Sequence, residues 1–187
     1  MTPEDEPDLS LARRAAGGEE RAFTLLMGRH KEALFKFARR LTGDHDQAYE
    51  VTQQSFISAW HAIDRFDGRP FDVWLRAIAL NKVRDLARRA AVRRLFGGSQ
   101  AEAERVVDPT PSTEGSLWRR EQLSALDRAI ARLPEALKAP LVLTIFDGRS
   151  HVEAAYILGI SPKAVETRVY RAKRRLEQEM RPWQSEY

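Results

Sequence analysis

The chain has 187 residues and contains no cysteine. The absence of thiols excludes disulfides, cysteine-ligated zinc, iron–sulfur clusters and cysteine nucleophiles, and it is typical of proteins in a reducing compartment. No stretch reaches the roughly 18 to 20 uninterrupted apolar residues that a membrane span requires. The first eight residues are acidic, whereas a signal peptide begins with a basic segment. We therefore expect a soluble, cytoplasmic protein.

Common catalytic motifs are missing as well. The sequence has no glycine-rich phosphate loop, no serine nucleophile elbow and no His-Glu-x-x-His motif. The run Asp44-His45-Asp46 is better explained as a helix cap and first-turn acid than as a set of metal ligands. We therefore expect no enzymatic activity, no cofactor and no bound metal.

The sequence also lacks the sustained two-residue alternation of β-strands, and its apolar residues recur every three or four positions. This periodicity predicts an all-α protein, with helices over residues 21–41, 44–63 and 71–89. Their expected inward faces are Phe23, Leu26, Met27, His30, Leu34, Phe37, Ala38 and Leu41 in the first, Ala48, Val51, Ser55, Phe56, Ala59 and Ile63 in the second, and Phe71, Trp74, Leu75, Ile78 and Leu86 in the third. Trp74 is assigned to the core, and not to DNA melting, because it lies within this apolar series.

A segment of different composition separates two helical parts. It contains Gly97-Gly98, two prolines, few large apolar residues, and four acidic residues against one basic residue, which is typical of a linker. The expected organisation is an acidic tail over 1–8, a domain over 9–95, a flexible linker over 96–116, a second domain over 117–181, and a C-terminal tail over 182–187. The aromatic Trp183 in this last tail is expected to dock on the first domain or on a regulatory partner.

The second domain contains the pattern of a helix-turn-helix. Ser150 and Glu153 form a Ser-x-x-Glu capping box, which predicts the start of a short helix. Ala155 supplies the small residue needed where two helices cross, and Gly159 can adopt the positive φ of the turn. Ser161-Pro162 predicts the start of the next helix, with Ser as the cap and Pro in the first turn. Together these features predict a DNA-binding helix-turn-helix.

The second helix of this motif has a buried side and a basic side. Residues 161–176 include six basic residues against one acidic residue. The side opposite the apolar seam presents Lys163, Glu166, Thr167, Tyr170, Arg171 and Arg174. Such groups suit phosphates and base edges. A basic helix face is as often merely solvated, but the adjoining turn favours DNA.

A second basic segment lies in the first domain, where residues 82–94 include six basic residues against one acidic residue. The net charge of the chain is only +4, because the acidic N-terminus and the acidic linker partly cancel both basic segments. Two basic elements joined by a flexible linker predict two separate contacts on one nucleic acid. Asp85 is expected to pair with Arg88 or Arg89.

Four blocks of sequence follow one another in a specific order. They are AYEVTQQSFISAW at 48–60, FDVWL at 71–75 with IALN at 78–81, Leu133-Pro134, and VETRVYRA at 165–172. In order, spacing and chain length they resemble the extracytoplasmic-function (ECF) sigma factors of bacterial RNA polymerase, which lack the middle domain of primary sigma factors. The resemblance covers both domains.

The resemblance implies a non-catalytic specificity subunit of RNA polymerase. Region 2, the first domain, would bind the β′ clamp helices and recognise and open the -10 promoter element. Region 4, the second domain, would recognise the -35 element through the basic face described above and would sit on the β flap. The implied clamp contacts are Tyr49, Glu50, Gln53, Gln54 and Ile57, and the implied -10 contacts are Phe66, Arg69, Asn81, Arg84 and Arg88.

The resemblance also implies control by an anti-sigma factor, often a membrane-anchored one, and a monomer outside its complexes that binds no small-molecule substrate. The main alternative is a helix-turn-helix repressor in which residues 9–95 serve dimerisation or effector binding. A repressor of this kind would be a two-fold symmetric dimer on a palindrome. A sigma factor would direct initiation only together with core polymerase.

Overall fold

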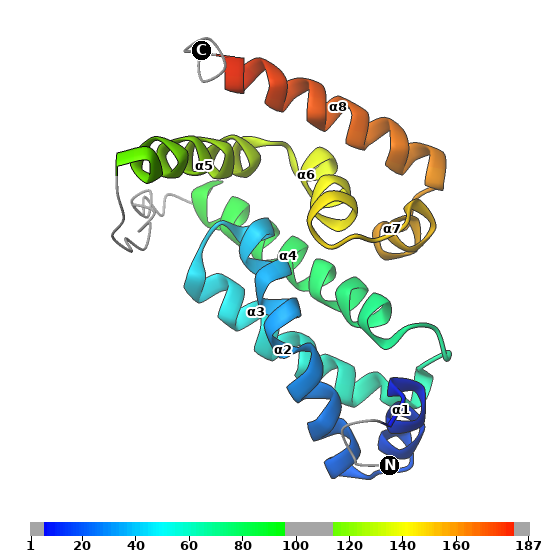
Figure 1. Ribbon diagram of the computed structural model, residues 1–187. Helices are drawn as coiled ribbons and strands as arrows, with labels where there is room; N and C mark the ends of the chain where they lie inside the picture. Colours follow the sequence, from blue (N-terminus) through cyan, green and yellow to red (C-terminus); the bar gives the residue numbers. More distant parts are fainter. Residues whose placement is uncertain (1–5, 96–113, 182–187) are drawn as a thin grey trace. The chain divides into compact units, whose positions relative to one another are not determined.

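The computed structural model describes residues 6–95 and 114–181, and within these ranges every secondary-structure element is helical (Figure 1). For Arg94 and residues 114–120 only the backbone is described. The all-α prediction is thereby confirmed. The helices fall into two compact units, one formed by α1 to α4 and the other by most of α5 to α8. Residues 96–113 of the expected linker and Trp183 lie outside the described residues.

The first unit is built on four contacts between helices. Helix α2 packs along α1 and α3, and both α2 and α3 pack against α4. The elements are α1 (Asp8–Ala16), α2 (Glu20–Thr42), α3 (His45–Ala62), the short 3-10 helix η1 (Ile63–Arg65) and α4 (Phe71–Leu95). The largest fully buried side chains of this unit are Phe37, Phe71, Leu11, Leu26, Leu34, Leu75, Leu80 and Val51.

Local signals in the sequence account for the boundary between α2 and α3. Gly43 ends α2 in the left-handed conformation with a φ of 73°, which glycine adopts without steric cost. The side chain of Asp44 then accepts a hydrogen bond of 2.8 Å from the backbone N–H of Gln47, so the expected N-cap is confirmed. A cap of this kind stabilises a helix by about 1 kcal/mol.

Most of the expected inward faces are buried. The five predicted core positions on α3 are buried, as is the sixth, Ile63, which lies in η1. Trp74 on α4 is only 8% exposed, which confirms its assignment to the core. On α2, however, Met27 stays 37% exposed and His30 is half-buried. The apolar stripe of α2 is therefore wider than the surface that its neighbouring helices cover.

Helix α1 is an element that the periodicity of the sequence does not predict, and it begins within the expected acidic tail. The carboxylate of Asp8 lies 2.7 Å from Arg29 Nη1 and 2.6 Å from His30 Nε2 on α2. The carboxylate of Glu6 forms an ion pair with Arg14. Glu6 and Asp8 therefore belong to the folded unit, because their carboxylates hold α1 and the turn before it in place.

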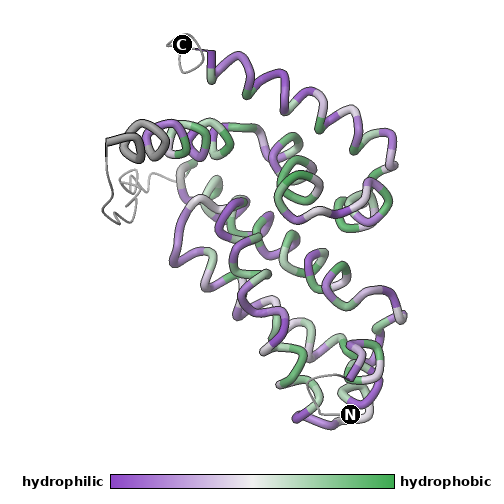
Figure 2. The backbone as a smooth tube through the Cα atoms, viewed as in Figure 1, coloured by the Kyte–Doolittle hydropathy of each residue, from purple (hydrophilic) through white to green (hydrophobic). Residues whose placement is uncertain are grey.

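The second unit ends in the 19-residue helix α8. Helix α8 packs against α5 and α6, and polar residues follow its whole length (Figure 2). The elements are α5 (Glu114–Arg132), α6 (Glu135–Leu141), the π-helical turn η2 (Val142–Phe146), α7 (His151–Leu158) and α8 (Pro162–Met180). Helix α5 thus starts inside the expected linker. None of the helices in the described part of the chain is long and apolar enough to cross a bilayer.

Candidate nucleic-acid and partner interfaces

The helix-turn-helix is assembled by caps that the sequence predicts. The backbone N–H of Ser150 donates to the Glu153 carboxylate at 2.8 Å, and the N–H of Glu153 donates to Ser150 Oγ at 3.2 Å. The capping box is therefore reciprocal. Gly159 has a φ of 69° in the turn, and Ser161 Oγ accepts from the N–H of Ala164 at 3.2 Å at the start of α8. These contacts fix where α7 and α8 begin.

Removing the first of these caps is expected to loosen α7. In the Ser150→Ala variant the N–H of Glu153 loses its acceptor, which costs about 1 kcal/mol. Hydrogen exchange of the full chain should show roughly fivefold lower protection of the α7 amides, because local opening is favoured by that amount. Ser150→Thr retains an acceptor and should exchange as the parent chain does. Equal protection in the Ala variant would contradict the cap assignment.

Helix α8 separates its apolar and basic residues onto opposite sides. Val165, Val169 and Ala172 are buried. On the opposite side, the predicted DNA-contact residues that are exposed are Lys163, Glu166, Tyr170, Arg171 and Arg174, with Thr167 half-buried among them. The structure therefore brings all six predicted residues onto one accessible side of a single helix. Exposed donors in this arrangement can reach phosphates and base edges in a major groove.

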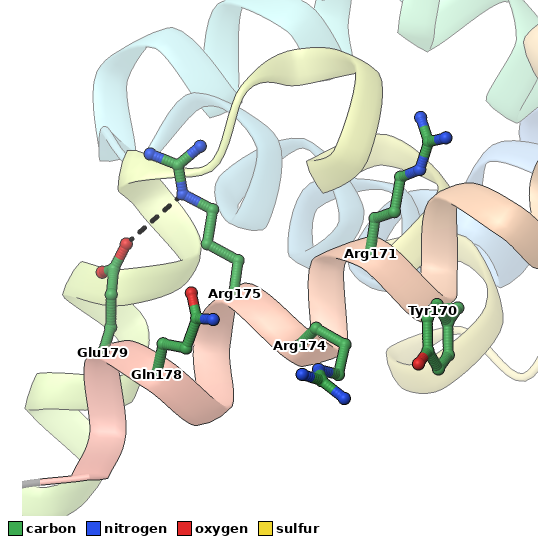
Figure 3. A pocket seen from close by; sticks show the side chains of 6 residues that line it. All are labelled: Tyr170, Arg171, Arg174, Arg175, Gln178 and Glu179. Carbon is green, nitrogen blue, oxygen red and sulfur yellow. Dashed lines mark ion pairs between the residues drawn. The ribbon is translucent and has the colours of Figure 1, made fainter.

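The C-terminal half of this side is hollowed. Side chains from successive turns of α8 line a hollow of about 630 Å³ (Figure 3). The lining residues are Tyr170, Arg171, Arg174, Arg175, Gln178 and Glu179. Arg175 leans toward Glu179, with an Nε–Oε1 distance of 3.6 Å, so its charge is partly balanced. Arg171 and Arg174 supply the remaining positive charge of the hollow.

The other basic side belongs to the C-terminal half of α4. Asn81 and Arg88 are exposed and Arg84 is half-buried, and their spacing of three and four residues places them on one side of the helix. Arg88 also forms an ion pair with Asp85, as the sequence predicts. Exposed ion pairs of this kind contribute little to stability, so the Arg88 guanidinium can exchange its partner for a phosphate.

The two residues of the loop before α4 occupy a different place. The Phe66 ring packs 5.8 Å from the Phe71 ring and 5.3 Å from the Trp74 ring, measured between centroids. Arg69 Nε donates to both carboxylate oxygens of Asp67, at 2.7 and 2.8 Å, and this hydrogen bonding lowers the pKa of Asp67. At 1.5 Å per residue, the loop and Asn81 lie roughly 15 Å apart along α4. The predicted -10 residues thus form two groups.

A long apolar groove runs between α2 and α3. Its volume is about 1220 Å³. Tyr49 and Ile57 are each 51% exposed, and Met27 is 37% exposed. The lining residues are Glu20, Phe23, Thr24, Met27, Gly28, Lys31, Glu32, Phe35, His45, Tyr49, Thr52, Gln53, Phe56, Ile57, Trp60 and His61. A mainly apolar groove whose lining also includes charged residues is typical of a surface that binds a protein partner.

The groove divides the five predicted clamp contacts. Tyr49, Gln53 and Ile57 line it, whereas Glu50 and Gln54 are exposed on α3 but are not among the lining residues. The α2 side of the groove was not predicted from the sequence. Met27 lies where periodicity predicts a core residue, but its side chain is exposed and lines the α2 side of the groove.

Among the described residues, no group of three or more His, Cys, Asp or Glu side chains could hold a metal ion. The Asp44 side chain serves as a cap. His45 Nδ1 lies 3.5 Å from Asp46 Oδ1, and both side chains are largely exposed.

Two helical units that each present a basic helix, one within a helix-turn-helix, define a nucleic-acid-binding protein.

Comparison with known proteins identifies the family. Residues 26–104 match the model described as Sigma-70 region 2, and residues 123–176 match the model described as Sigma-70, region 4. The chain is 42% identical over 171 residues to the RNA polymerase sigma factor NccH of Alcaligenes xylosoxydans xylosoxydans, covering 90% of this chain and 92% of NccH. It is 41% identical over 182 residues to the RNA polymerase sigma factor CnrH of Cupriavidus metallidurans, covering 94% and 95%.

Solved structures agree with this result. The complex of CnrH with the cytosolic domain of CnrY has a sigma chain that is 36% identical, with a TM-score of 0.68 and coverage of 91% of this chain and 95% of that chain. The sigma factor RpoE in complex with the anti-sigma factor NepR from Bartonella quintana is 26% identical, with a TM-score of 0.71 and coverage of 88% and 98%. The chain belongs to the ECF sigma factors of the sigma-70 family, which are non-enzymatic transcription initiation factors.

Proposed function

We propose that this sigma factor recognises promoters through two separate helix sides. Within region 4, the basic side of α8 contacts the -35 element, with Lys163 at its N-terminal end and Arg174 toward its C-terminal end. The placement of exposed donors opposite a buried seam supports this assignment, because a recognition helix contacts bases from the accessible side of its N-terminal half.

Region 2 is proposed to recognise and open the -10 element. Asn81, Arg84 and Arg88 on α4 supply hydrogen bonds and phosphate neutralisation for an unpaired strand. Phe66 and Arg69 lie in the loop at the start of the same helix. Since the Phe66 ring is half-buried against Phe71 and Trp74, its part is to support the loop while Arg69 faces the nucleic acid.

The groove between α2 and α3 is proposed as the contact for core RNA polymerase, at the β′ clamp helices, while region 4 sits on the β flap. An anti-sigma factor would hold the chain inactive by covering the same groove. The support is the exposure of apolar side chains at Met27, Tyr49 and Ile57, which a partner would remove from water. Because polymerase acts in the cytoplasm, we propose that location and a monomer outside these complexes.

The observation that carries the proposal is the presence of one exposed basic helix side in each of the two matched sigma regions. Run-off transcription tests it, with bacterial core polymerase and templates in which both promoter elements are randomised. Chain and core together should select a subset of templates, and neither should do so alone. A lack of any promoter-dependent product would refute the proposal. A stable dimer bound to a palindrome without polymerase would instead favour a repressor.

A further inference from the structure

The first turn of α8 holds an oppositely charged pair on the side proposed to face DNA. Lys163 Nζ lies 2.8 Å from Glu166 Oε2, and the two side chains are 79% and 54% exposed. We infer that this pair recognises a single C·G base pair of the -35 element, with Glu166 selecting the cytosine and Lys163 the guanine. This inference rests on the proposed function of α8.

The position of the pair suits contact with bases. Ser161 caps α8 and Pro162 is its first residue, so Lys163 and Glu166 both lie in the N-terminal part of the helix, where recognition helices contact base edges. Thr167 Oγ1 donates to the carbonyl of Lys163 at 2.9 Å. Because this hydrogen bond uses the single donor proton of the Thr167 hydroxyl, the ion pair supplies the charged groups that this part of the helix can offer to DNA.

The major-groove edge of a C·G pair matches this arrangement of one acceptor beside one donor. Cytosine presents the N4 amino donor, and guanine presents the O6 and N7 acceptors next to it. N4 and O6 are hydrogen-bonded to each other across the pair, at roughly 3 Å, close to the separation of the two charged groups of the protein. Carboxylates accept from cytosine N4, and lysine donates to guanine O6 and N7. An A·T pair also places a donor, adenine N6, next to an acceptor, thymine O4, but the adenine N7 acceptor then lies beside the donor, where it repels a carboxylate, and the thymine methyl group lies beside the acceptor.

The charge state of Glu166 supports its role as an acceptor. The hydrogen bond from Lys163 is the largest cause that lowers the pKa of Glu166 below its ordinary value. The side chain is therefore ionised at neutral pH and can only accept hydrogen bonds. A carboxylate repels guanine O6 and thymine O4, so the same atom that selects cytosine rejects those two bases at its position.

The test uses the full chain with core polymerase and templates whose -35 element is randomised, with sequencing of the transcribed templates. The parent chain should prefer C·G at one position by about tenfold over the other pairs, as a good base contact provides. Glu166→Gln can donate as well as accept, and it should lose that preference at this one position while other positions keep theirs. Glu177→Gln removes the same charge from an exposed residue farther along α8 and should leave all preferences unchanged.

Three other results have distinct meanings. If Glu166→Gln lowers transcription equally from all templates, Glu166 supports the helix without selecting a base, and the inference is wrong. If the parent chain prefers an A·T pair at the position that loses its preference, the cytosine assignment is wrong. If the parent chain shows no -35 preference at any position while it still binds core polymerase, the proposed role of α8 fails first, and the two failures are thereby separated.

Discussion

Replacing Arg171 and Arg174 together by alanine is expected to lower -35-dependent transcription about tenfold or more at limiting sigma concentration. Both guanidinium groups line the hollow on the accessible side of α8. Each one that neutralises a phosphate releases bound counterions, so the salt dependence of promoter binding should become shallower by about one unit of slope per arginine. Binding of region 2 to the core polymerase clamp should not change, because that proposed contact lies outside region 4.

Arg128→Ala provides the control within the same unit. Arg128 is exposed on α5, outside the side of α8 that is proposed to face DNA. This variant removes one positive charge without touching the proposed DNA side, and should change the salt slope by much less. Promoter binding and transcription at several salt concentrations measure the effect. A double arginine variant that transcribes as the parent does, or one that loses core binding, would show that the hollow is not a DNA contact.

Local signals made the helix-turn-helix and the start of α3 predictable from the sequence. The caps at Asp44, Ser150 and Ser161 and the positive φ of Gly159 each depend on residues within one turn. Side-chain hydrogen bonds over such short separations are specified by residue type and spacing. The side of α8 that faces solvent follows in the same way from the 3.6-residue period.

Features that depend on contacts between distant segments were not predictable. Helix α1 is held by Asp8, whose partners Arg29 and His30 lie more than twenty positions away. In the groove between α2 and α3, Met27 stays 37% exposed although it lies at a predicted core position. Periodicity gives the apolar side of a helix, but it does not give how much of that side the neighbouring helices cover.

Arg76 is a third case, since this basic residue on α4 is buried beside Asp72 and the Phe37 ring.

The second large effect is expected at Ile57, one of the predicted clamp residues that line the groove. Ile57→Glu places a charge on an apolar lining position, and binding of a partner would have to desolvate it. We expect core polymerase affinity to fall by about 2 kcal/mol or more, roughly thirtyfold. Because the Ile57 side chain is half exposed, region 2 should keep its fold, and the thermal unfolding profile of the variant checks this.

Gln54→Glu is the matched control for this variant. It adds the same charge to the same helix one turn away, at an exposed residue that does not line the groove. If the groove is the contact surface, Ile57→Glu should weaken binding of core polymerase, measured by competition against the parent chain, whereas Gln54→Glu should have a much smaller effect. Equal losses of affinity in the two variants would mean that binding responds only to the charge of α3 and not to the groove. A normal affinity in Ile57→Glu would remove the groove from the interface, because no partner that fills it could accommodate an uncompensated carboxylate.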